Sequence, residues 1–103
     1  MLRVFVTEAQ RHHGELLYEW ILERARALAI PGGSAFRAIA GYGRHGILHE
    51  QGFFELAGSL PVQLEFLVTD EQARALLDVL REERLDLVYA LQDVEFGQTG
   101  HPR

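Results

Sequence analysis

The glycines and side chains best suited to binding chemistry lie together in residues 41–49. Gly41 and Gly43 would let a ligand approach the backbone closely, and Arg44 follows them directly. An arginine beside glycine N–H groups suits an anion. The stretch also spells G-x-G-x-x-G, but the dinucleotide fingerprint requires a helix to begin there, and residues 47–49 (Ile-Leu-His) offer no helix start. We therefore expect either a ligand cradle or glycines that only bend a ribbon.

Arg37 is a charged residue in an otherwise apolar stretch that begins at Phe36. A buried charge needs a partner, and Glu65 is the obvious one if the strand register places the two opposite each other. Binding of an anion by Arg37 is the alternative. The candidate ligand-binding residues are Arg37, Gly41, Gly43, Arg44, His45 and His49.

His45 and His49 have the spacing of two metal ligands on a helix, but this segment is expected to be extended or coiled. Zinc normally takes three or four protein ligands, and only Glu50, His12 or His13 could complete the set. We expect no metal site. Both histidine pairs are interpreted as solvated or hydrogen-bonded side chains, with His12-His13 as a surface pair that precedes the first helix.

The residue types give little support to catalysis. Ser34 and Ser59 lack the context of a nucleophile elbow, and the absence of cysteine excludes a thiolate nucleophile. Glu8, near the end of the first predicted strand, could serve as a general base, but no group that would tune it is identifiable. We expect a binding protein and not an enzyme.

Length and charge restrict the class of protein further. A chain of 103 residues suits one domain with a modest core. A net charge of −5 makes nucleic acid a poor partner, so none is expected. Residues 1–7 are too short an apolar run for a signal peptide, and no stretch approaches membrane-spanning length. We therefore expect a cytoplasmic protein.

Hydrophobic periodicity divides the chain into strands and helices. The predicted elements are a strand at 2–7, a helix at 15–29, a strand from 36 to about 41, a strand at 60–68, a helix that ends near 83 and a strand at 87–96. Thr69 and Gln72 form a capping-box signature at the start of the second helix. The connection of about 15 residues before the third strand is long for a small domain, and such connections are more often functional than idle.

This order, β-α-β-β-α-β, predicts an α+β fold of the ferredoxin-like kind, with two helices on one face of a four-stranded antiparallel sheet. The alternation of residues predicts that the other face is apolar. The residues expected on it are Phe5, Ile39, Leu67, Tyr89 and Leu91. An apolar face open to water marks an interface, and the sheet edges also need protection. We predict an oligomer closed around the open faces.

An ordered set of residues carries a resemblance to a known family. Its members are Glu8, Arg11, Leu17-Tyr18, Phe36-Arg37, Gly41-Tyr42-Gly43, His45, His49, Leu60-Pro61-Val62 and Asp93-Val94-Glu95. In these positions the chain resembles the PII-like family catalogued as domain of unknown function 190. The resemblance runs to Phe96 and implies one domain at residues 1–96, followed by a polar tail at 97–103.

The resemblance implies a homotrimer whose clefts between subunits bind a small anionic ligand, adenine nucleotide first. Residues 44–56 would correspond to the mobile T-loop of PII signalling proteins, which docks on a transporter or an enzyme. The implied role is regulatory, because a ligand that prefers one loop arrangement shifts the population that a target recognises. The chain departs from PII proteins at residues 82–86, which are charged and contain no glycine where those proteins carry a phosphate-binding loop.

Two other functions remain open. One is a metal-binding trimer that resembles the CutA family and uses His45 and His49. The other is a small enzyme of the dimeric α/β-barrel kind, which has the same topology in a different assembly.

Overall fold

The computed structural model describes residues 1–41 and 60–100 of the chain. Within them the elements follow one another as β1 (Leu2–Thr7), β2 (Arg11–His12), β3 (Glu15–Leu16), α1 (Leu17–Ala27), β4 (Gly33–Arg37), β5 (Pro61–Phe66), α2 (Asp70–Glu82) and β6 (Val88–Leu91). Among the predicted site residues, Gly43, Arg44, His45 and His49 lie outside the described residues, as do the 44–56 segment and most of the long connection.

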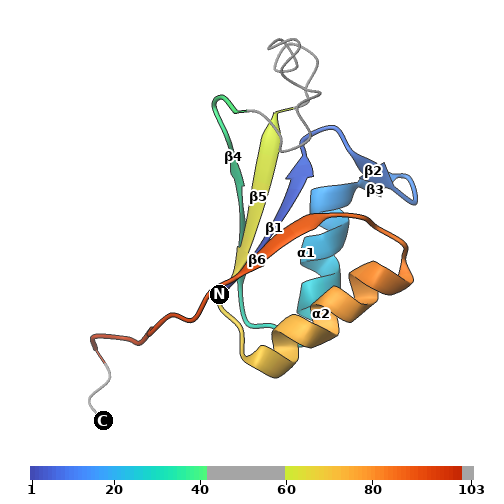
Figure 1. Ribbon diagram of the computed structural model, residues 1–103. Helices are drawn as coiled ribbons and strands as arrows, with labels where there is room; N and C mark the ends of the chain where they lie inside the picture. The colour runs from blue at the N-terminus through green and yellow to red at the C-terminus, as the bar shows by residue number, and fades with distance from the viewer. Residues whose placement is uncertain (42–59, 101–103) are drawn as a thin grey trace.

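The main sheet has four strands in the order β4-β5-β1-β6, and all three neighbouring pairs are antiparallel. Both helices pack on one face of this sheet, and the opposite face is uncovered (Figure 1). The order of the strands places β5 between β1 and β4, which is the split β-α-β arrangement. The predicted ferredoxin-like α+β fold is confirmed.

The core lies between the sheet and the two helices. Alternate residues of β1 (Leu2, Val4 and Val6) are buried, and those between them are half-buried, as a period of two requires. The central strand β5 shows the same alternation. From the helices, the most completely buried large side chains are Leu17, Ile21 and Leu76. None of the helices in the described part of the chain is both long and apolar enough to cross a membrane.

The first helix begins later than the predicted residue 15, because residues 11–16 form a small hairpin of β2 and β3. His13 and Gly14 make its turn with φ angles of 53° and 84°. Positive φ at both central residues is typical of the two-residue hairpin turn. The residues between the predicted strand at 2–7 and the predicted helix at 15–29 therefore include a strand of this hairpin.

Both helices end in a residue of left-handed conformation that is not glycine. After α1, Ala29 has φ 66°, and the N–H of Ile30 donates to the carbonyl of Ala25. After α2, Arg84 has φ 59°, and the N–H of Leu85 donates to the carbonyl of Leu80. These bonds define the Schellman motif. The first helix thus ends at Ala27, two residues before the predicted end at residue 29.

The second helix begins as predicted. The Thr69 side chain accepts from the backbone N–H of Gln72, and the Gln72 side chain accepts from the backbone N–H of Thr69. The capping box predicted from these two residues is confirmed.

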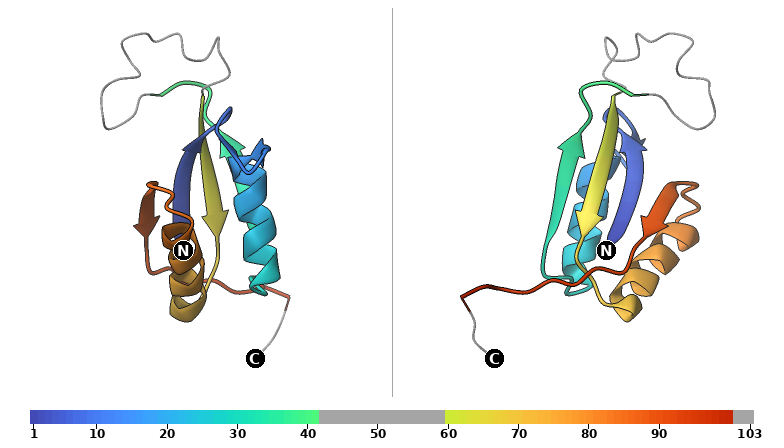
Figure 2. Two further views of the ribbon diagram at one scale, coloured as in Figure 1. Left: turned by 90° about the vertical axis from the view of Figure 1, so that its right-hand side faces the viewer. Right: turned by 60° about the vertical axis from the view of Figure 1, so that its left-hand side comes forward.

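The strand predicted from residue 36 is wrong in its bounds, since β4 runs from Gly33 to Arg37. Gly33 lies opposite Phe66 in the sheet, and a Cβ on Gly33 would stand 2.5 Å from Cε1 of Phe66. Glycine is therefore needed at this strand position because the backbone packs closely on an aromatic ring. The local sequence around residue 33 does not predict this contact. The last strand is also shorter than predicted, and the chain continues beyond it as an extended segment (Figure 2).

The uncovered face of the sheet is only partly apolar. Pairing across the sheet gives one polar row, Ser34–Glu65–Arg3–Ala90, and one mainly apolar row, Phe36–Gln63–Phe5–Val88. The expectation for Phe5 is confirmed, but the expectation for Tyr89 and Leu91 is wrong. These two residues pair with Val4 and Leu2 and so share the face that the helices cover.

The close packing at Gly33 generates a prediction. Gly33→Ala should lower the free energy of unfolding by about 1–3 kcal/mol, because the new methyl group would force the Phe66 ring to move. Urea denaturation measures the change. The matched control is Gly32→Ala, where no atom lies within 4 Å of the added Cβ and a change within about 0.5 kcal/mol is expected. Equal losses in the two variants would contradict the described contact.

Candidate functional site

A cleft of about 340 Å³ lies at the end of the sheet where β1 and β4 end and β5 begins. We call it the Arg37 cleft. It is lined by Glu8, Tyr18, Ala35, Arg37 and Val62. The two ends of the long connection lie at this same end of the sheet. A Cβ on Gly41 would contact Pro61 at the start of β5, and the carbonyl of Leu60 accepts from the N–H of Glu8.

Backbone contacts hold the walls of the Arg37 cleft. The N–H of Glu8, directly after β1, donates to the carbonyl of Leu60 at 2.8 Å. The N–H of Ala38, directly after β4, donates to the carbonyl of Pro61 at 2.9 Å. Pairing of the three strands therefore continues one residue past β1 and β4. The sheet and not a free loop positions the polar residues of the cleft.

Arg37 and Glu8 form an ion pair across the cleft. Nη1 of Arg37 donates to Oε2 of Glu8 at 2.8 Å, with 60% of the arginine side chain and 30% of the glutamate side chain exposed. The pair is open to water, so it adds little to stability. It places a cation and an anion side by side at the mouth of the cleft.

The predicted ion pair between Arg37 and Glu65 is wrong. The register sets Arg37 opposite Val62, on the face that the helices cover, whereas Glu65 lies on the opposite face. There Glu65 accepts from Nε of Arg3 at 3.1 Å. Two residues of adjacent strands can pair only if the register gives them the same face, and the sequence does not state the register.

The composition of the Arg37 cleft suits a ligand with both an anionic group and hydrogen-bond donors. Arg37 uses one N–H for Glu8, and its guanidinium fork has further N–H groups that could donate to an anion. The Glu8 carboxylate accepts hydrogen bonds. Half-buried Tyr18 adds an aromatic ring, and buried Val62 provides apolar surface. A carboxylate so close to the arginine disfavours an anion that has no donor groups.

Among the residues that the structure describes, Gly41 is the one other predicted site residue, and it lies near this end of the sheet. Gly41 lies a few residues after β4, and a Cβ placed on it would be 3.5 Å from Cγ of Pro61, an ordinary contact. Packing against the described residues therefore does not require glycine there. Glu8 and Tyr18 were not predicted as ligand-binding residues. In the sequence, Glu8 is a possible general base and one of the residues that carry the family resemblance, and its position directly after an alternating strand is the signal that points to the cleft.

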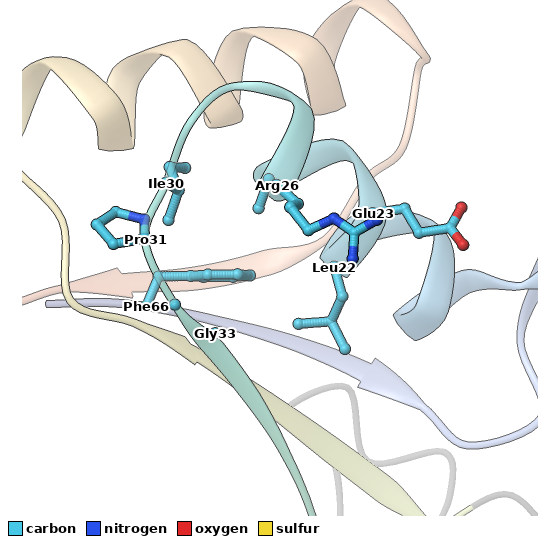
Figure 3. Close-up of a pocket in the computed structure, with 9 residues that line it drawn as sticks. Leu22, Glu23, Arg26, Ile30, Pro31, Gly33 and Phe66 are labelled. Atoms are coloured by element: carbon cyan, nitrogen blue, oxygen red, sulfur yellow. The ribbon is translucent and has the colours of Figure 1, made fainter.

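A second cleft of about 310 Å³ lies at the other end of α1, between that helix and the start of β4 (Figure 3). Phe66, Ile30 and Pro31 line its apolar part, and Glu23 and Arg26 project from the helix beside it (Figure 3). It contains none of the residues predicted to bind a ligand. The Arg37 cleft is the better candidate because its polar groups converge at one point.

A third group of polar side chains joins the β2–β3 hairpin to the end of α2. Nε2 of His12 lies 2.9 Å from Oε1 of Glu83, and Nε2 of His13 lies 3.1 Å from the same oxygen. These hydrogen bonds, from His12 first and then His13, hold the pKa of Glu83 below its usual value. The predicted surface pair of histidines is therefore in contact with a distant carboxylate.

Comparison with known proteins gives relatives over most of the chain. The family model described as "Uncharacterized ACR", domain of unknown function 190, matches residues 1–96. A UPF0166 protein of Aquifex aeolicus is 35% identical over 95 residues, which are 92% of this chain and 90% of the relative. A UPF0166 protein of Methanocaldococcus jannaschii is 30% identical over 82 residues, covering 80% of this chain and 75% of the relative.

The exposure of the Arg37–Glu8 pair generates a prediction about its role. Arg37→Gln should change the free energy of unfolding by less than about 1 kcal/mol, because an ion pair in water contributes little. Chemical denaturation measures it. Leu64→Ala on the adjacent strand, at a site with no exposure, should cost about 2–5 kcal/mol and calibrates the assay. A loss of similar size in Arg37→Gln would make the arginine a structural residue.

Proposed function

We propose that this chain, which belongs to the family of domain of unknown function 190, is a regulatory protein that binds a small anionic ligand in the Arg37 cleft. One observation carries the proposal: an exposed arginine, a carboxylate and an aromatic ring converge where the long connection leaves and re-enters the sheet. A ligand held there would contact the base of that connection directly.

An adenine nucleotide is the ligand whose chemistry fits these groups best. Its phosphate would take the N–H groups of Arg37 that do not donate to Glu8. Its ribose hydroxyls or exocyclic amine would donate to Glu8. Tyr18 supplies a ring of the kind on which a base stacks. The volume of about 340 Å³ is at the lower end of the range for small-molecule sites, which suits a cleft that a second subunit completes.

The proposal includes a homotrimer, and the exposure of the sheet edges supports an assembly. Every residue of the edge strands β4 and β6 is exposed, in contrast to the alternately buried central strands. On the open face, Phe36 is 53% exposed and Val88 is 39% exposed. Unpaired strand edges and apolar surface are both features that association removes from water. Subunits joined through these surfaces would place a neighbour beside the Arg37 cleft.

Regulation would follow from differential binding. A ligand that contacts Arg37 and the base of residues 42–59 binds one arrangement of that segment more tightly than others, and so raises its population. A transporter or an enzyme that recognises residues 44–56 would then distinguish the liganded protein from the free one. The ligand would also contact Glu8 directly, which couples its binding to the end of β1.

The nucleotide proposal predicts a stabilisation that depends on Arg37. Among ATP, ADP, AMP and cyclic AMP, at least one should raise the melting temperature, since a ligand at about 100 times its Kd adds roughly 2.7 kcal/mol. Differential scanning fluorimetry with the four nucleotides tests this. Arg37→Gln should abolish most of the shift. Arg3→Gln is the matched control, because Arg3 is also paired with a glutamate but on the opposite face of the sheet.

Failure of all four nucleotides to shift the wild-type melting temperature would reject the adenine nucleotide as the ligand. A shift that Arg37→Gln leaves unchanged, or that Arg3→Gln removes, would reject the Arg37 cleft as its site.

The proposed assembly predicts a trimer that depends on the open face. Phe36→Glu should convert the trimer into smaller species, because a charge would replace a ring that is 53% exposed in the isolated chain. Size-exclusion chromatography with multi-angle light scattering measures the mass. Arg74→Glu changes charge on the solvent side of α2 and should leave the mass unchanged. A monomer in the wild type would contradict the proposal, and a dimer would favour the enzyme of the α/β-barrel kind.

A further inference from the structure

We infer that His12, His13 and Glu83 form a binding site for a divalent transition-metal ion, zinc first, which ties the β2–β3 hairpin to the end of α2. This inference is independent of the nucleotide proposal, since none of the three residues lines the Arg37 cleft. It also differs from the metal site weighed in the sequence, which involved His45 and His49.

The distances already approach those of a coordination sphere. One ligand atom from each of the three residues lies within 4.8 Å of the other two. Both histidine Nε2 atoms converge on one oxygen, at 2.9 and 3.1 Å. Ligand atoms around a tetrahedral zinc ion with bonds of 2.0–2.1 Å stand about 3.3 Å apart. The two histidine–Glu83 distances would therefore need to open by only a few tenths of an ångström for a metal ion to replace the two hydrogen bonds.

The backbone brings two consecutive histidines to the same partner, which a regular strand cannot do. Neighbouring residues of a strand point to opposite faces. Here His12 ends β2 and His13 begins the turn with a left-handed φ of 53°, so both rings reach Glu83. Arg11 braces the turn from Nη2 to the carbonyl of Gly14 at 3.0 Å. Histidine adopts a left-handed φ more readily than most residues other than glycine, which suits His13 to this turn position.

The surroundings of the cluster favour a cation and orient its ligands. Glu83 is the C-cap of α2, at the negative end of the helix dipole. The His12 ring meets the ring of buried Trp20 edge-on, with centroids 4.6 Å apart and planes at 77°. The His12 side chain is 14% exposed, so its rotation is restricted by packing. A pre-oriented ligand loses less entropy when it binds metal.

The donor set indicates both the ion and an open coordination position. Two imidazoles and one carboxylate suit zinc, and the same trio leaves the fourth zinc position to water in catalytic sites. The His13 side chain is 65% exposed, so this fourth position would face solvent. The site would therefore hold an exchangeable ion that can accept a ligand from another molecule.

The single tryptophan of the chain provides a direct readout of the site. Trp20 lies against His12, and cobalt(II), a paramagnetic substitute for zinc, quenches the fluorescence of a nearby indole. Titration of the intact protein with cobalt(II) chloride should quench Trp20 with saturation at one ion per chain. Zinc chloride, which does not quench, should restore the fluorescence by competition. Zinc should also raise the melting temperature, because it binds only the folded arrangement.

Two variants test the ligands without removing the His12–Trp20 contact. His13→Asn keeps a residue that tolerates left-handed φ, and Glu83→Gln keeps the shape of the C-cap side chain. Each should weaken cobalt(II) binding by at least about 10-fold. The double variant His45→Ala/His49→Ala is the matched control, since it removes two other histidines and should leave the titration unchanged.

The inference fails if cobalt(II) at millimolar concentration gives no saturable quenching of the wild type. It fails equally if both His13→Asn and Glu83→Gln titrate like the wild type, or if the double variant at residues 45 and 49 alone loses binding. Circular dichroism on each variant separates loss of a ligand from loss of the fold. If one of the two variants unfolds, the cobalt(II) titration of the other variant tests the inference.

Discussion

The antiparallel pairing of β1 with β5 at the centre of the sheet is the constraint on which the other features depend. Val4 lies opposite Leu64, and Arg3 lies opposite Glu65. Because side chains alternate between faces, this one register sends the apolar pair to the helices and the ion pair to the open face. A slip of one residue in either strand would exchange its two faces, exposing its apolar side chains and burying its charge.

The same register explains why the Arg37 cleft exists. Pairing with β5 places the Arg37 side chain on the face that the helices cover. However, β4 is an edge strand and all of its residues are exposed, so the Arg37 side chain is not buried. The arginine therefore extends toward the end of β1, where Glu8 is the available carboxylate. The result is a charged pair held by paired strands at the base of the long connection. In such a site the paired strands fix the positions of the backbone atoms, whereas the exposed side chains can change rotamer.

The short segment between β1 and α1 connects the two polar sites of the described chain. Its first residue, Glu8, belongs to the Arg37 cleft, and its hairpin carries His12 and His13 to Glu83. A metal ion on the hairpin would cross-link His12 to Glu83, which are 71 residues apart in the sequence. Such a cross-link stabilises a small domain, whose core supplies little free energy by itself.

Local patterns in the sequence were enough to predict the order of the main elements, the faces of β1 and β5 and the capping box at Thr69, because each depends on near neighbours in the chain. Tertiary structure alone decided which carboxylate Arg37 meets, since that depends on the register of strands far apart in sequence. It also decided that His12 and His13 meet Glu83. Alternation and capping depend on residues close together in the sequence. A contact across about 70 residues depends on how whole elements pack, and the hydrophobic periodicity of the sequence does not predict it.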